Sequence, residues 1–408
     1  MALTSLTDAL AVVLSAAPAP PAAESISLDE ALGRVLAVTV TSDIDVPAAD
    51  NSAMDGYALC ATDAPGELRV SQRIAAGHAP ASLSMGTAAR IFTGAILPDG
   101  ADTVVMQEQA VAHDGKVSIL GHVRLGQNVR RQGSDIKAGA EVLAAGKVLT
   151  PQDIGLLAAV GRASVTVYRR LRIAVMSTGD ELLTPGTAIQ GPWQVYNSNQ
   201  YQMSAQLRAL GMTPVVIDAV LDDPQVIGEA LERAAARADV LLTTGGVSVG
   251  DEDHVRGQIE ARGELALWKL AIKPGKPLSF GRVGETPIFG LPGNPVSAWV
   301  TFALVVKPWL LKAQGITPQA MHSVAASANF EMHRAGTREE YLRVKLVSVD
   351  GVLHAELAGS QSSGVLSSVS AADALAVIHI GTTVALGETV QVLMMSELLA
   401  APYALSPA

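Results

Sequence analysis

The middle of the chain alternates short apolar runs with segments of helical periodicity. Apolar runs at 172–176, 214–217 and 239–243 flank two segments, about 198–210 and 223–238, in which apolar residues recur along one helix face. This alternation is typical of βαβ units, whose parallel strands are covered by helices on both faces, and it predicts a doubly wound α/β domain. The pattern continues with a helix at about 252–262, strands near 278–280 and 287–289, and a helix that begins at Asn294 and Pro295.

The regions on either side of this domain have the alternating pattern of β-strands. Between Thr39 and Val148 only short alternating runs occur, separated by Gly, Pro and Asp turns, which predicts one or two small β domains. Alternation returns after about residue 324. We therefore expect a multidomain α/β plus β protein, whose last β domain has strands at 340–347, 352–357, 374–380 and 389–394.

Two further helices are predicted by their N-terminal signals. Ser27 and Glu30 have the spacing of a capping box, and apolar residues follow at helical intervals over about 28–37. The pair Thr150-Pro151 places a capping residue before a proline at the first helical position, and Gly161 ends that pattern.

Composition and charge limit the classes of function. A chain of 408 residues forms about two to four domains, and its 49% apolar and 17% charged residues are typical of a globular protein. The net charge of −10 gives no whole-chain attraction to nucleic acid or anionic membranes, so any anion site must be local. The single cysteine, Cys60, excludes an internal disulfide framework and multi-cysteine metal sites, and it fits a cytoplasmic protein.

We expect neither a secretory signal nor a membrane span. The first basic residue is Arg34, so the apolar N-terminus lacks the positive region of a signal peptide. The densest apolar run, 296–311, contains Lys307 and Pro308 and is expected to fall short of a membrane span.

Ligands of open α/β sheets bind beyond the carboxyl ends of the strands, so the loops there are the first candidates for a site. Residues 244–251 read Thr-Gly-Gly-Val-Ser-Val-Gly-Asp, which suits a backbone that approaches a phosphate, although a tight connection explains the glycines equally well. Residues 291–297 contain an ordinary helix start, with Asn294 as the capping residue and Pro295 at the first helical position. These two signals do not explain why Pro292 and Gly293 stand directly before the cap.

Charged residues lie close to these loops in the sequence. Lys269, Lys273 and Lys276 fall within eight positions, and they supply positive charge for a phosphate if they are not simply a solvated face. Acids follow several strand ends, where each alone is explained as the first turn of a helix. Together they can hold a hard cation such as Mg²⁺. These acids are Asp180, Glu181, Asp222, Asp223, Asp251, Glu252 and Asp253.

Two segments stand out in the first β region, at 47–58 and 129–136. Taken alone, the first contains a turn pair, Asp55-Gly56, and the second contains two adjacent arginines. Cys60 lacks a nearby histidine and the eight histidines form no ligand-spaced pair, so thiol nucleophile chemistry and a histidine zinc site are disfavoured.

Five segments, in order along nearly the whole chain, resemble the molybdopterin molybdenumtransferase family, the MoeA-type proteins whose relatives include the E domain of gephyrin. The segments are 51–58, 177–182, 244–250, 272–277 and 291–297. The resemblance implies insertion of molybdate into adenylated molybdopterin, with hydrolysis of the adenylate and release of AMP and molybdenum cofactor. It implies dependence on a divalent cation, normally Mg²⁺.

The resemblance also implies an elongated homodimer, in which the active cleft lies between the α/β domain of one subunit and the β domains of the other. The expected partners are a molybdopterin adenylyltransferase upstream and molybdoenzyme maturation proteins downstream, with no nucleic acid and no membrane. Asp55, Glu181 and Asp253 are the acids expected closest to the chemistry and to Mg²⁺, with Asp135 and Asp222 as further catalytic acids. The expected substrate-binding residues are Thr93, Ser177, Thr178, Gly245, Gly246, Ser248, Lys269, Lys273, Lys276, Pro292, Gly293, Asn294 and Pro295.

Four domains follow from the resemblance. They are a linking α+β domain over 25–46 and 137–168, a β-rich domain over 47–136, an α/β molybdopterin-binding domain over 1–24 and 169–324, and a C-terminal β-barrel-like domain over 325–408. Two positions of the β-rich domain depart from the family pattern: Ile96 stands where proline is common, and Ser134 where glutamate is frequent.

Three other functions have sequence features that separate them from insertion. An adenylyltransferase of the related type needs only about 150–200 residues. A gephyrin-like scaffold is expected to contain an added binding region, but the enzyme-like domains account for the 408 residues. A nucleotide-binding regulatory module without turnover predicts loss of the acids, which are present.

Overall fold

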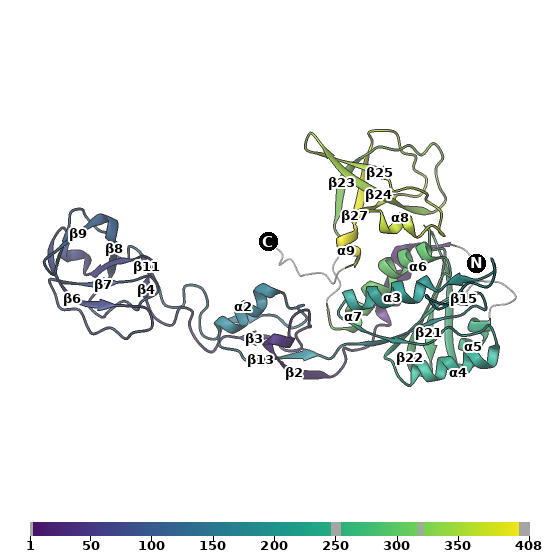
Figure 1. Ribbon diagram of the computed structural model, residues 1–408, viewed down its shortest axis with the longest axis horizontal. Coiled ribbons are helices and arrows are strands. Elements are labelled where there is room, and N and C mark those ends of the chain that lie inside the picture. The colour runs from purple at the N-terminus through teal and green to yellow at the C-terminus, as the bar shows by residue number, and fades with distance from the viewer. Residues whose placement is uncertain (1–2, 246–253, 317–320, 400–408) are drawn as a thin grey trace.

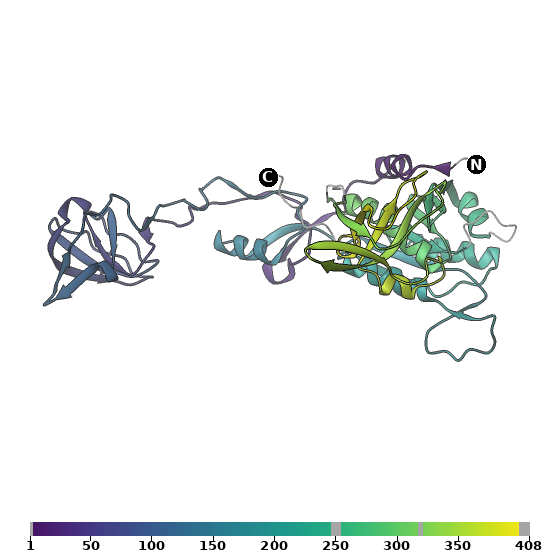
Figure 2. The same cartoon turned by 90° about the horizontal axis from the view of Figure 1, so that it is seen from above.

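The chain forms an elongated molecule (Figures 1 and 2). This computed structural model describes residues 3–245, 254–316 and 321–399. Three predicted site residues, Gly246, Ser248 and Asp253, lie outside these ranges. One β domain stands at one end, a small α+β unit lies in the middle, and an α/β domain with a second β domain beside it forms the other end.

A seven-stranded sheet forms the centre of the α/β domain, in the order β1-β19-β21-β22-β18-β14-β17. The prediction of parallel strands is correct for β14, β17, β18 and β22, which pair in parallel. It is wrong for β21, which pairs antiparallel with both β19 and β22; a tight turn rather than a helix connects β21 to β22. The strands are β1 Leu3–Thr4, β14 Arg172–Ser177, β17 Thr213–Val216, β18 Val240–Thr244, β19 Gly263–Leu270, β21 Pro277–Val283 and β22 Thr286–Leu291.

Helices cover both faces of this sheet, as predicted. Ile173 and Val175 of β14 belong to the core under α1, α3, α6 and α7, whereas Ala174 and Met176 belong to the core under α4 and α5. The alternation along β14 therefore assigns each helix group to one face. The helices are α1 Leu6–Ser15, α3 Ser198–Ala209, α4 Pro224–Ala235, α5 His254–Arg262, α6 Pro295–Thr301 and α7 Lys307–Ala313, with a π-helical turn at Phe302–Val306 between the last two.

Residues 295–313 form one long apolar helix. Contrary to the sequence-based expectation, its length and hydropathy suffice for a membrane span, but 89% of its most apolar stretch is buried inside the protein. The π-helical turn directly precedes Pro308, whose ring clashes with the preceding turn of a regular helix. The buried amine of Lys307 donates to the backbone carbonyl of Glu397, and burial lowers the pKa of Lys307 to about 8.

The middle unit contains one confirmed helix and one incorrect prediction. Thr150 and Asp153 form a reciprocal capping box at α2, Pro151–Ala159, as expected from Thr150-Pro151. The predicted helix over 28–37 is only a 3₁₀ turn, Leu28–Glu30, because Leu36 continues into β-bridge pairing with β13. The paired strands are β2 Ala23–Ser27 with β13 Ser164–Tyr168, and β3 Val40–Thr41 with β12 Glu141–Leu143.

The first β domain is built on a six-stranded sheet in the order β8-β5-β7-β6-β10-β9. Its two faces carry separate apolar cores, one around Tyr57 and Val105 and one around Ala58 and Val104. The strands are β5 Gly56–Leu59, β6 Gly66–Ile74, β7 Thr87–Ile91, β8 Thr103–Met106, β9 Ala110–His113 and β10 Lys116–Ile119, with β4 Asn51–Ser52 paired to β11 Val129–Arg130 beside them.

The C-terminal strands close into a five-stranded barrel, because β26, at one end of the strand order, also pairs with β24. A barrel-like domain was expected here, with four strands; the strand not predicted is β23. A short strand of the α/β domain, β20 Ile272–Lys273, pairs in parallel with β24 and joins the two domains. The elements are β23 Ser323–Ala328, β24 Glu339–Val349, β25 Val352–Leu357, α8 Ser367–Ser370, β26 Ala374–Ile378, β27 Thr389–Met394 and α9 Met395–Leu399.

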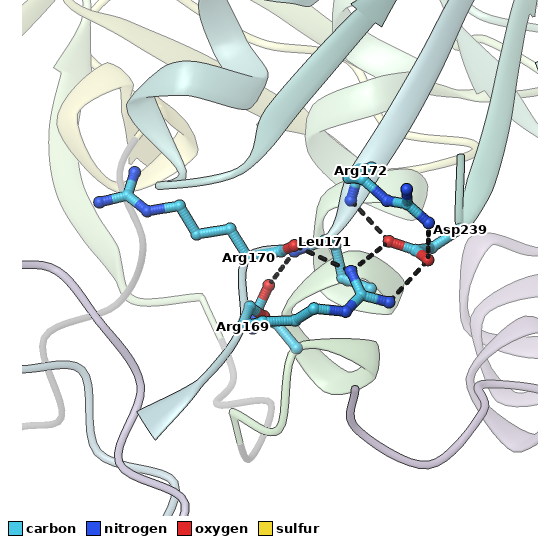
Figure 3. A network of polar contacts seen from close by, with 6 residues as sticks. Arg169, Arg170, Leu171, Arg172 and Asp239 are labelled. Carbon is cyan, nitrogen blue, oxygen red and sulfur yellow. Dashed lines mark hydrogen bonds and ion pairs between the residues drawn. The ribbon is translucent and has the colours of Figure 1, made fainter. Parts of the chain in front are cut away.

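An arginine cluster fixes the start of β14 against the start of β18 (Figure 3). Both terminal nitrogens of Arg169 donate hydrogen bonds to the carboxylate of Asp239, each at 2.8 Å. The backbone N–H of Arg172 donates a third, also at 2.8 Å. Burial alone raises the pKa of Asp239, but these hydrogen bonds outweigh it and lower the pKa to about 2.

We predict that Asp239→Asn lowers the free energy of unfolding at pH 7 by about 1 to 2 kcal/mol. The folded-state pKa lies below the unfolded value of about 3.9, so this stabilisation is present above pH 4 and is lost as pH falls toward 2. Urea denaturation of the full chain at pH 7 and pH 3 measures the difference. The control is Glu285→Gln, because the Glu285 side chain is 96% exposed. It should leave the free energy of unfolding unchanged at both pH values. Equal destabilisation by Asp239→Asn at both pH values contradicts the assignment.

Candidate functional site

Three neighbouring parallel strands end at one edge of the α/β sheet. Thr244 at the end of β18 is paired with Ser177 of β14 and with Leu291 of β22. The hydroxyls of Ser177 and Thr244 are buried and 3.0 Å apart, within hydrogen-bond distance. The loops that begin at Thr178, Gly245 and Pro292 therefore start side by side, as the sequence predicts.

Glycines allow two of these loops to touch. Gly245 has φ +87°, and a Cβ at this position would lie 2.9 Å from the carbonyl oxygen of Thr178. A Cβ at Gly293 would lie 3.8 Å from the Cα of Gly245, so these two predicted residues are in contact across the site. The N–H of Gly245 donates to the carbonyl of Leu291 at 3.3 Å. A side chain at Gly245 would require the backbone to move.

Two buried oxygen atoms beside these glycines have no hydrogen-bond partner among the described residues. One is the hydroxyl of Thr178, a predicted substrate-binding residue, and the other is Oδ1 of Asn199 in the first turn of α3. Asn199 Nδ2 donates to the carbonyl of Gly293 at 2.8 Å, which fixes the direction of Oδ1. Buried polar atoms without partners cost free energy, and a bound ligand relieves that cost.

Sequence reasoning missed Asn199. The available signal was its place at the start of a helix that follows the first of the three strands, two residues after the capping residue Asn197. Helix capping explains Asn197 but does not explain Asn199.

Carboxylates gather at the neighbouring ends of β14 and β17. Asp180 Oδ1 accepts from the backbone N–H of Asp222 at 3.0 Å. Burial raises the pKa of Asp222, and the negative charges of Asp180 and Glu181 raise it further. The carboxylate of Glu181 folds back over Gly179, where a Cβ would lie 2.5 Å from Oε2. These are oxygen donors of the kind that Mg²⁺ prefers.

The three predicted lysines do not form one loop. Lys269 lies in β19, Lys273 in β20, and Lys276 follows them in a turn. The turn packs on α6, because the carbonyl of Gly275 accepts from the Thr301 hydroxyl at 3.5 Å. Lys273 Nζ lies 3.1 Å from a carboxylate oxygen of Glu340 in the C-terminal barrel, an ion pair that sequence reasoning did not anticipate.

The C-terminal barrel also reaches the start of α6. Asn294 is the N-cap residue and Pro295 follows it as predicted, but the Asn294 side chain makes no capping hydrogen bond. Instead, the backbone N–H of Val296 donates to the carbonyl of Ser363 at 3.1 Å. The loop around Ser363 is held by Arg343, which is buried, has no carboxylate partner among the residues that the structure describes, and donates to two carbonyls of this loop. Nothing in the local sequence marks Arg343 or Ser363, because their role depends on domain packing.

Three predicted residues lie in or next to the first β domain. Asp55 Oδ1 accepts from both the backbone N–H and the hydroxyl of Thr93, each at 2.8 Å. These hydrogen bonds lower the pKa of Asp55 and keep it ionised. Asp135 lies on the connection to the middle unit, where its N–H donates to the carbonyl of Val46 at 3.0 Å.

A single chain does not bring the two sets of residues together. The β domain with Asp55 and Thr93 stands at the opposite end of the molecule from the α/β domain with Glu181 and Asp222 (Figure 1). Within residues 3–245, 254–316 and 321–399, no three His, Cys, Asp or Glu side chains are grouped so as to hold a metal ion. The metal site therefore stays a prediction.

Comparison with known proteins places the whole chain in one family. Three family models match in order: the MoeA N-terminal region (domain I and II) over residues 4–161, a probable molybdopterin binding domain over 174–312, and the MoeA C-terminal region (domain IV) over 325–395. The chain is 39% identical to a molybdopterin molybdenumtransferase of Nostoc sp. over 91% of this chain and 88% of that protein. It is 35% identical to one of Haemophilus influenzae over 97% and 100%, respectively.

A solved structure supports the same relationship. The molybdopterin biosynthesis MoeA protein from Pyrococcus horikoshii OT3 superposes with a TM-score of 0.83 at 29% identity, covering 96% of this chain and 100% of that one. Sequence identity, domain order and fold thus agree, and the chain belongs to the MoeA family of molybdopterin molybdenumtransferases.

Proposed function

We propose that this protein inserts molybdate into adenylated molybdopterin, hydrolyses the adenylate, and releases AMP and molybdenum cofactor. The observation that carries the proposal is the meeting of the Thr178, Gly245 and Gly293 loops at one sheet edge in a chain of this family. Two curated relatives are named for the transferase activity.

The loops of the α/β domain suit a polar, phosphorylated ligand. Gly245 and Gly293 leave room for close approach to the backbone, and buried oxygens of Thr178 and Asn199 offer hydrogen-bonding positions. A pterin carries N–H donors that such acceptors bind. Lys273 adds positive charge for the phosphate groups, and its ion pair with Glu340 holds it at the junction with the barrel.

Catalysis requires cleavage of the phosphoanhydride between the pterin phosphate and AMP. Water attacks one phosphorus of the anhydride, the bridging oxygen leaves with the other phosphate, and the protons of the water pass to phosphate oxygens or solvent, which gives AMP and the pterin monophosphate. The protein contributes by orienting the two phosphates against the loops and by placing carboxylates for the incoming oxygen. Glu181 follows β14 and Asp222 follows the neighbouring parallel strand β17, so both acids come after strands that end at the edge where these loops begin.

The carboxylates also suit Mg²⁺. Burial raises the pKa of Asp222, and repulsion from the carboxylates of Asp180 and Glu181 raises it further. A bound cation would relieve that repulsion. When bound, Mg²⁺ neutralises charge on the phosphate oxygens. In this proposal Glu181 holds the ion with Asp253 and with Asp55 of the partner subunit.

The proposal therefore includes a homodimer. Asp55 and Thr93 lie too far along the molecule to reach Glu181 of their own chain (Figure 1), and a two-fold pairing of elongated chains brings the β domain of one subunit to the α/β domain of the other. Upstream, a cytoplasmic adenylyltransferase supplies the adenylated pterin, and maturation proteins of molybdoenzymes receive the product.

The test is the reaction itself. Purified protein is incubated with adenylated molybdopterin and Mg²⁺, with and without molybdate, and AMP is followed by chromatography. We expect AMP to appear only when molybdate is present, and chelation of Mg²⁺ to stop its release. Consumption of AMP, or a requirement for ATP, contradicts insertion and supports the adenylyltransferase alternative. A protein that binds the pterin but never releases AMP fits a scaffold.

We predict that Gly245→Ala lowers AMP release at least about tenfold, which corresponds to about 1.4 kcal/mol. The new Cβ meets the Thr178 carbonyl and the backbone has φ +87°, so the loop must shift away from its contact with Gly293. The control is Gly257→Ala in α5, where a Cβ meets nothing within 4 Å. That variant should keep full activity. If Gly245→Ala kept full activity and an unchanged loop, the close approach of the loops at Gly245 would not be needed for the reaction, which contradicts the prediction.

A further inference from the structure

Next to Asp55, the first β domain carries two arginines in line with the core residue Tyr57. Register pairs Tyr57 of β5 with Arg90 of β7, and Arg90 with Arg73 of β6. Residues directly opposite each other project from the same face of a sheet. Tyr57, Arg90 and Arg73 therefore form one row across three strands, and Asp55 precedes Tyr57 by two residues at the same end of β5.

An irregularity in β6 places Arg73 in this row. The register with β7 shifts between Val70 and Gln72 by one extra residue. Without the shift, Arg73 would stand opposite Ile91, which is 0% exposed and belongs to the core. With it, Arg73 stands opposite Arg90. Bulges that redirect a side chain are frequent beside functional sites.

Both arginines stack on one aromatic ring. The Cζ atoms of Arg73 and Arg90 lie 4.5 Å and 4.6 Å from the centroid of the Phe92 ring. Attraction to the ring holds each guanidinium at this position. Two like charges on one ring repel each other, and among the described residues neither forms an ion pair with a carboxylate. A bound anion would relieve this repulsion.

The two arginines differ in their remaining contacts. Arg90 donates to the carbonyl of Gly56 at 2.9 Å and to Gln107 Oε1 at 2.6 Å, so its position is fixed. Its charge also contributes, after the stronger hydrogen bonds from Thr93, to the lowered pKa of Asp55. Arg73 is exposed, and in the described part of the chain its guanidinium has no hydrogen-bond acceptor. Arg73 is the donor available to a ligand.

We propose that Arg73 binds a tetrahedral oxyanion in the active cleft, with Phe92 and Arg90 as positioning residues. The inference rests on the proposed function, since Asp55 and Thr93 bring this edge of the β domain to the cleft of the partner subunit. The planar edge of a guanidinium matches two oxygens of such an anion. Two sources share this chemistry: the phosphate of the adenylate, retained in AMP, and molybdate.

The test measures binding separately from turnover. Calorimetry of the full-length protein with AMP and, in parallel, with molybdate gives both dissociation constants. We expect Arg73→Gln to weaken one of them about 5- to 20-fold, in the range of a lost charge-assisted hydrogen bond. The matched control is Arg69→Gln, the same charge change on an exposed residue of the same strand that lies before the shift in register. It should leave both constants unchanged.

Two further variants separate anion binding from general charge. Arg73→Lys keeps the charge but lacks the planar edge, so it should recover only part of the affinity. Phe92→Leu removes the stacking surface without changing charge, and it should weaken the same anion as Arg73→Gln.

Each outcome is decisive for the inference. If Arg73→Gln weakens the binding of AMP alone, Arg73 binds the adenylate phosphate. If it weakens the binding of molybdate alone, Arg73 binds the metal oxyanion. Unchanged dissociation constants in Arg73→Gln, or an equal loss in Arg69→Gln, overturn the proposal. Wild-type protein that binds AMP through Arg73 but releases none from adenylated molybdopterin would remove the proposed function and leave this inference standing.

Discussion

Parallel pairing of β14, β18 and β22 is the constraint on which the candidate site depends. Because Thr244 is paired on both sides, the three strands end at one level, and three loops far apart in the sequence begin together. The contact between Gly245 and Gly293 is a consequence of that register. A shift of one residue in either pairing would exchange the two faces of a strand and move the loops out of contact. The arginine cluster around Asp239 fixes the other end of two of these strands, β14 and β18 (Figure 3).

The rest of the molecule adds groups to this edge from a distance. The C-terminal barrel reaches it twice, through the Lys273–Glu340 ion pair and through the hydrogen bond between Val296 and Ser363. The first β domain carries an ionised acid, Asp55, at its far end, held by Thr93. Asp55 has no described partner from the α/β domain of its own chain, and in the homodimer proposed above its partner domain belongs to the second chain.

Much of the fold could be predicted from local pattern. The α/β alternation, the capped helix at Thr150 and the strands of the C-terminal domain are all consequences of periodicity and turn residues, whereas the closure of those strands into a barrel was expected only from the family resemblance. The failures have a common cause, which is tertiary pairing that overrides a local signal. The capping-box spacing at Ser27 predicts a helix, but Leu36 is drawn into pairing with β13. The parallel pairing expected from the α/β alternation fails at β21, which pairs antiparallel with β19 and β22 because short connections join it to both.

The candidate site was predictable where glycine, proline and acid residues follow strands, as at Gly245, Gly293 and Asp222. It was not predictable where a role arises from domain packing or register. Ser363 approaches α6 only in the folded chain, and Arg73 reaches its face only through a bulge. Asn199 has an unremarkable sequence context, and its buried oxygen is apparent only beside Gly293.

The central claim is that each active cleft combines the α/β domain of one subunit with the β domain of the other. Mixed dimers of Asp55→Asn and Glu181→Gln chains, isolated through two different affinity tags, test it most directly by their rate of AMP release. Each variant alone should be inactive, whereas the mixed dimer has one intact cleft of two and should regain about half of the wild-type rate. Mixed dimers of Asp55→Asn with Thr93→Ala, both altered in the β domain, should stay inactive. An inactive Asp55→Asn/Glu181→Gln mixed dimer would contradict the shared cleft.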